Sequence, residues 1–189
     1  MEKGYLFILV GTLFATNLHI PMMPLEFFIW WERLTFWGFI LISLGMRQVG
    51  GTEKELKYAQ FFTMLSLLIR FGLPWISELA LPFESIVLLA LRLVFVFSPL
   101  AIFFWLFKSE YLWSPSSAKR MDWYIYTAVA LVYLILNVMI MLPVITLTAH
   151  AITLLNMRQF ADILYNIVLI GLLVKLYLAA RNDVGRNRW

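Results

Sequence analysis

Six apolar segments, each long enough to cross a lipid bilayer, follow one another along this chain of 189 residues. A membrane-spanning helix needs roughly 20 predominantly apolar residues. In hydrocarbon, only helices and closed barrels satisfy every backbone polar group internally. The sequence therefore predicts an all-α fold, a polytopic integral membrane protein built as a six-transmembrane-helix bundle. The predicted spans cover residues 4–20, 25–46, 58–80, 83–107, 123–143 and 159–180.

The composition excludes a soluble globular protein. Only 14% of the residues are charged and 62% are hydrophobic, whereas about 25% charged residues is usual for soluble domains. Because the spans use most of the chain, we expect residues 1–189 to form a single transmembrane domain. The first segment lacks a positively charged start and a small-residue cleavage site, so we expect it to be a retained span and not a signal peptide.

Basic residues alternate between the connections and so predict the orientation. The 47–57 connection, the 108–122 connection and the tail after residue 180 each carry several lysines or arginines. The 20–25 and 74–83 connections carry none. Short loops rich in Lys and Arg stay in the cytoplasm. The pattern predicts that both termini are cytoplasmic and that the protein is a multi-pass protein of the cell membrane.

The 144–158 connection does not resemble the others. It reads VITLTAHAITLLNMR, which is too apolar for a plain loop and too short for another span. Irregular backbone exposed to lipid is not tolerated at depth. We therefore expect an interfacial or re-entrant helix on the outer side.

Arginines inside three successive apolar segments are the main functional clue. A charge in hydrocarbon costs several kcal/mol unless it is paired or faces water, so such residues are candidates for a functional site. At about 1.5 Å per residue, all three arginines fall in the outer half of the bundle, at a similar depth to an asparagine of the fifth span. In the second span, Glu26, Trp30 and Arg33 share one helix face. The predicted ligand-binding residues are Glu26, Trp30, Arg33, Arg70, Arg92 and Asn137.

The inner half of the bundle offers mainly hydroxyl groups until Lys175, so we expect apolar packing to close it. An alternative interpretation of the outer polar layer is structural. The arginines can neutralise nearby acids in ion pairs that fix helix packing, or extend to the membrane interface. In the first span, Gly11 and Ala15 form a small-residue pair that permits close helix contact.

Three functions fit these residues. The first is binding, and also transport or transfer, of a polar or anionic small molecule or lipid headgroup from the outer face. The second is a non-transporting accessory or assembly subunit that pairs with a membrane protein partner or with further copies of itself. The third is a membrane enzyme acting on a lipid-linked substrate, with Glu or His as acid–base groups.

We expect binding and not catalysis, because the sequence contains no phosphate loop and no nucleophile motif. The absence of cysteine excludes thiolate metal sites. The two histidines, His19 and His150, lack metal-ligand spacing. We therefore expect no metal, no cofactor and no nucleic acid, and the lipid bilayer as the general partner.

Overall fold

The computed structural model describes residues 2–15, 25–49, 54–78, 84–112, 116–141 and 151–186. Apart from Ser116, these residues are helical, and within them there is no strand, which confirms the all-α prediction. The elements are α1 (Glu2–Ala15), α2 (Leu25–Val49), α3 (Lys54–Glu78), α4 (Glu84–Phe107), the π-helix η1 (Lys108–Leu112), α5 (Ser117–Met141) and α7 (Ala151–Arg186).

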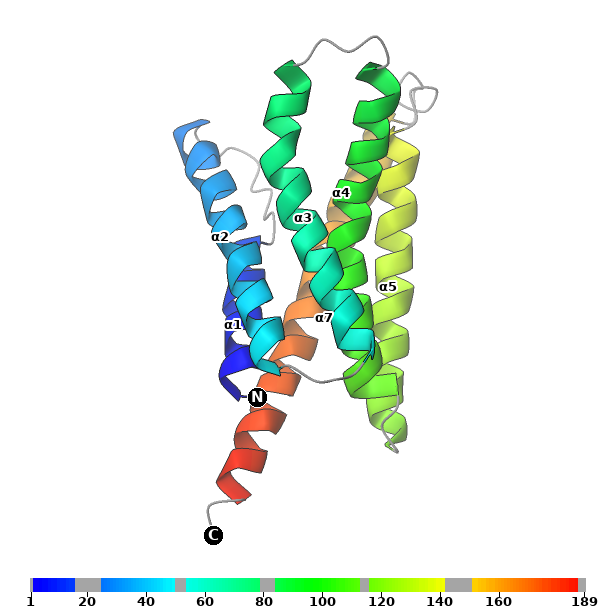
Figure 1. Cartoon of the computed structure of the whole chain (residues 1–189). Helices are drawn as coiled ribbons and strands as arrows, with labels where there is room; N and C mark the ends of the chain where they lie inside the picture. Colours follow the sequence, from blue (N-terminus) through cyan, green and yellow to red (C-terminus); the bar gives the residue numbers. More distant parts are fainter. Residues whose placement is uncertain are drawn as a thin grey trace.

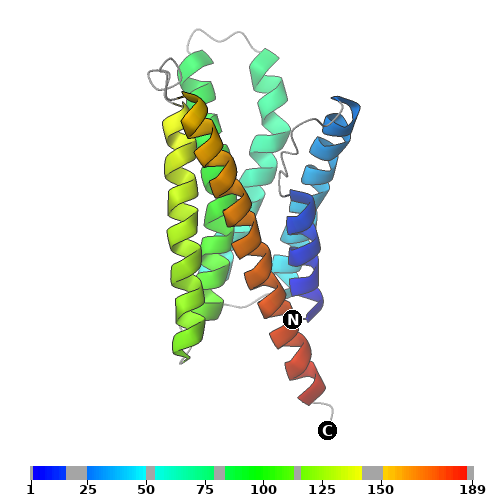
Figure 2. The same cartoon turned by 180° about the vertical axis from the view of Figure 1, so that it is seen from behind.

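The α-helices run alternately up and down the bundle (Figure 1). Helix α1 begins and α7 ends at the same end, which we call the terminal end; the opposite end is the distal end. Helix α7 runs diagonally across one face, from beside α5 at the distal end to beside α1 at the terminal end (Figure 2). It therefore connects the α1–α2 pair with the rest of the bundle.

Three described helical segments are long and apolar enough to cross a membrane: Leu89–Leu112, Ser117–Ile140 and Ile152–Asn182. Many large apolar side chains on these segments point outward, among them Leu131, Ile152 and Phe160. Soluble monomers rarely expose contiguous apolar surface on this scale. These helices are therefore suited to a place in a membrane.

Each predicted apolar segment overlaps a described helix, and the helix boundaries differ from the predicted ones at two connections. Residues 108–112, predicted as part of a connection, continue α4 as η1, and α5 begins at Ser117. Residues 151–158 form the first turns of α7, so the prediction of a separate interfacial or re-entrant helix is wrong for them. The stretch from Ala151 onward contains no proline to interrupt a helix. Residues 144–150 lie outside the described part.

Glycines bring the backbones of α1 and α2 into direct contact. A Cβ atom at Gly11 would lie 2.5 Å from the carbonyl oxygen of Gly38, and one at Gly45 would lie 2.6 Å from that of Gly4. A Cβ atom at Gly38 would lie 3.1 Å from the Cβ of Ala15. The small-residue pair in the first helix is therefore confirmed as a packing contact.

This contact predicts a sharp difference between two glycine substitutions. Gly11→Ala should destabilise the protein by about 1–3 kcal/mol, because the added methyl group meets backbone atoms that cannot move aside. Gly171→Ala in α7 should cause no loss, since no heavy atom lies within 4 Å of its Cβ position. The measurement is the fraction of monodisperse protein left after heating in mild detergent. Equal behaviour of the two variants would contradict the close contact.

Candidate functional site

The residues predicted to bind a ligand lie near the distal end of their helices. Arg33, Arg70 and Arg92 are each about two turns from the distal end of α2, α3 and α4, respectively. Their backbones therefore occupy matching positions along three neighbouring stretches of the chain, each in the distal half of its helix. Glu26 and Trp30 occupy the first two turns of α2. The side chains of these five residues lie outside the described part, so the site that they are predicted to form stays a prediction.

Asn137 is the member of this set whose side chain is described. It is buried about one turn from the distal end of α5. Its Nδ2 atom donates a hydrogen bond to the carbonyl oxygen of Tyr133 at 2.9 Å. The amide is therefore anchored to its own helix in the distal part of α5.

Three buried or partly buried tyrosines connect α4, α5 and α7 on the terminal side of Asn137. The hydroxyl of Tyr126 donates to the carbonyl oxygen of Leu100 at 3.0 Å and lies 3.3 Å from the hydroxyl of Tyr165. The ring of Tyr133 stacks on that of Tyr165, with centroids 5.0 Å apart and an interplanar angle of 12°. These contacts satisfy polar groups that would otherwise be buried without a partner.

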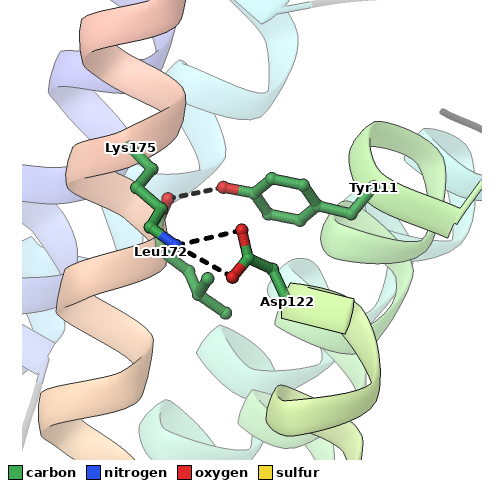
Figure 3. A network of polar contacts seen from close by, with 4 residues as sticks. All are labelled: Tyr111, Asp122, Leu172 and Lys175. Atoms are coloured by element: carbon green, nitrogen blue, oxygen red, sulfur yellow. Dashed lines mark hydrogen bonds and ion pairs between the residues drawn. The ribbon is translucent and has the colours of Figure 1, made fainter. Parts of the chain in front are cut away.

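A second group of polar contacts closes the terminal end (Figure 3). The Tyr111 hydroxyl of η1 donates to the carbonyl oxygen of Leu172 at 2.9 Å. Lys175 on α7 donates to both carboxylate oxygens of Asp122 on α5, at 2.8 and 3.1 Å. The lysine side chain is 60% exposed, so this ion pair contributes only about 0–1 kcal/mol to stability. Its main effect is to fix Asp122 against α7.

The π-helix also connects the two parts of the bundle. The hydroxyl of Tyr5 on α1 donates to the Glu110 carboxylate on η1. Between α3 and α4, the buried hydroxyl of Ser66 donates to that of Ser98 at 2.7 Å. One hydrogen bond between side chains thus joins α1 to η1, and another joins α3 to α4.

We call the polar residues between α4, η1, α5 and α7 the polar seam: Tyr111, Asp122, Tyr126, Tyr133, Asn137, Asp162, Tyr165, Asn166 and Lys175. Sequence reasoning noticed only single members of this set. A signal was present on the fifth helix, where Asp122, Tyr126, Tyr133 and Asn137 follow a spacing of 4, 7 and 4. Such spacing places side chains on one helix face.

The described part of the chain holds no group of three His, Asp or Glu residues arranged to bind a metal ion. One buried polar atom in the same part, the indole Nε1 of Trp123, has no hydrogen-bond partner. Comparisons with protein-family models, with curated proteins and with solved structures found no match to this chain. The function must therefore be argued from the residues and their positions.

The polar seam predicts that a single hydroxyl supports the packing of α4, α5 and α7. Tyr126→Phe should lower the free energy of unfolding by about 1–3 kcal/mol, because it leaves the Tyr165 hydroxyl with fewer partners in a buried site. Tyr124→Phe is the matched control, since Tyr124 is exposed on the same helix. Denaturant titration of both variants in detergent measures the difference. A loss of equal size in both would contradict a role for the buried hydroxyl.

Proposed function

We propose that the protein is a six-span, multi-pass protein of the cell membrane with both termini in the cytoplasm. The up-and-down helix order supports this topology, because it puts the start of α1 and the end of α7 at one end (Figure 1). That end also carries the basic residues that retain loops in the cytoplasm, among them Lys3, Arg47, Lys57, Lys119 and Arg181.

Within that topology, the function best supported is binding, with transport or transfer, of a polar or anionic small molecule or lipid headgroup from the outer face. The observation that carries this proposal is the matched position of Arg33, Arg70 and Arg92, each about two turns from the distal end of its helix. Three cations at one level of an apolar bundle are costly unless they meet water, acids or a ligand. An anion recognised by several arginines fits this arrangement.

The packing of the other half of the bundle supports a site with one opening. The fully buried side chains toward the terminal end are mostly large and apolar, including Phe39, Ile42, Met46, Leu106 and Phe107. Several polar groups described there are bonded to one another or to backbone, as between Tyr111 and Leu172 (Figure 3). A ligand that reached the arginine level would therefore enter from the distal end.

An accessory subunit is the second candidate, because described charges of this chain are paired within it. Asp122 is bound by Lys175 and Glu110 by Tyr5. If Arg33, Arg70 and Arg92 are paired with acids in the same way, the layer fixes helix packing and no ligand is needed. The two candidate functions predict different effects of replacing one arginine: loss of a bound anion in the first, and loss of the folded protein in the second.

The topology predicts the outcome of reporter fusions. Fusions after residues 51, 117 and 189 should report the cytoplasm, and fusions after residues 79 and 151 should report the outside, because basic connections are retained. Enzymatic reporters active on one side of the membrane make the measurement. An outside signal at 51, 117 or 189 would refute the six-span arrangement.

The ligand site predicts that Arg33→Ala and Arg92→Ala each remove a bound anionic molecule while the protein still accumulates. Arg33→Lys should weaken binding without abolishing it, because lysine keeps the charge but loses the planar guanidinium. Arg47→Ala, at the terminal end, is the control and should bind normally. Mass spectrometry of small molecules that co-purify in mild detergent measures the effect.

If the alanine variants fail to accumulate, the arginines are structural pairs, since a stranded buried partner costs about 3–5 kcal/mol. If they accumulate and retain every co-purified molecule, the ligand site is wrong.

A further inference from the structure

An apolar groove of about 300 Å³ runs between α4 and α5. Both walls belong to segments that can cross a membrane. The hydroxyl of Thr127 in the groove donates to the carbonyl oxygen of Trp123 on its own helix at 2.9 Å, which leaves the lining apolar in character. The main lining residues are Phe97, Ala101 and Trp105 on α4 and Thr127, Ala130 and Leu134 on α5.

Basic residues continue both walls of the groove at its terminal end. The Nζ atom of Lys108 lies 4.6 Å from the ring centroid of Trp105, which lines the groove. On α5, Arg120 precedes Thr127 by about two turns and therefore shares its helix face. A third cation, Lys54, lies 6.0 Å from the ring centroid of Tyr58, and this ring packs against Trp105 with centroids 4.8 Å apart.

The two acids that lie nearest to Lys108 and Arg120 in the sequence have other partners. Glu110 accepts a hydrogen bond from Tyr5, and Asp122 is bound by Lys175 (Figure 3). Tyr5 leaves the negative charge of Glu110 in place, but Lys54, Lys108 and Arg120 outnumber that charge, so the local charge at this end of the groove is positive. An apolar channel that ends in cations complements a molecule with an apolar tail and an anionic head.

We propose that the groove holds an acyl chain of an anionic phospholipid, with the phosphate of its headgroup against Lys108 and Arg120. The groove alone would not select a lipid, because acyl chains are as apolar as the side chains of neighbouring helices. Selection comes from the cations, which attract anionic headgroups at a membrane surface. Trp105 is two residues from the end of α4, where the ring of a tryptophan in a spanning helix would meet headgroups. This site is at the terminal end, away from the arginine layer at the distal end.

The test is native mass spectrometry of the delipidated full chain in a neutral detergent at low ionic strength. The probes are phosphatidylglycerol and phosphatidylcholine with identical acyl chains. Each cation near a headgroup gives about a fivefold preference for the anionic lipid, so two cations predict about 25-fold. Added salt should reduce the preference. Glycerol phosphate, which has the anionic group but no acyl chain, should not displace the bound lipid.

Two pairs of variants separate the headgroup from the acyl chain. Lys108→Gln and Arg120→Gln should each lower phosphatidylglycerol affinity about fivefold and leave phosphatidylcholine affinity unchanged, whereas Lys57→Gln on α3 should change neither. Ala130→Phe fills the groove and should lower the affinity for both lipids. Val132→Phe, at an exposed position on the same helix, is its control.

Equal affinities of the unaltered protein for the two lipids would overturn the proposal. So would an Ala130→Phe variant that binds as well as Val132→Phe, or a dimer whose formation excludes lipid, because a second copy would then occupy the groove. If Ala130→Phe does not fold, the glutamine variants decide, because Lys108 and Arg120 lie outside the buried core. Arg33→Ala should retain the preference, which distinguishes this lipid from any ligand of the distal layer.

Discussion

The need to pair polar groups inside an apolar surrounding governs how these helices are arranged. An unpaired buried hydroxyl or carboxylate is costly where no water can replace the missing partner. Along the polar seam, Tyr126 meets a backbone oxygen and Tyr165, and Asp122 meets Lys175. The first of these contacts fixes α5 against α4, and the other two fix α7 against α5. The seam therefore defines a unique packing where apolar surfaces alone would permit sliding.

Helices α1 and α2 are held together by close backbone packing and not by polar side-chain contacts such as those of the polar seam. Their interface contains glycines, and its stability comes from the close approach of two backbones. The pair is joined to the rest of the bundle by α7 and by the hydrogen bond from Tyr5 to Glu110. The π-helical turn η1 is thus a junction, because Glu110 contacts α1 while Tyr111 contacts the backbone of α7. A short irregular turn at the end of α4 links both halves.

The length and hydrophobicity of the apolar segments predicted the helical class and the stretches in which the helices lie, because backbone in an apolar surrounding must form its hydrogen bonds internally. The start of α7 was not predicted, because residues 144–158 are too apolar for a plain loop and too short for another span, although no proline in 151–158 prevents a helix. The tyrosines of the seam were not predicted either. A tyrosine counts as apolar in a sequence pattern, and only the neighbouring helix shows whether its hydroxyl has a partner. The arginine layer remains a prediction from sequence.

The basic residues at the two ends of the bundle differ in how far they lie from the helix ends, and this difference affects where a ligand can bind. At the terminal end, Lys175 is mostly exposed and Lys108 lies over an aromatic ring, so these charges keep contact with water or headgroups at little cost. At the distal end, Arg33, Arg70 and Arg92 lie about two turns inside their helices. A lysine or arginine at a helix end can extend to the interface, whereas a charge two turns inside an apolar helix is costly unless it is paired or faces water. If one anion binds all three arginines, as proposed, it would link the distal halves of α2, α3 and α4. Ligand occupancy and distal packing are therefore expected to be coupled.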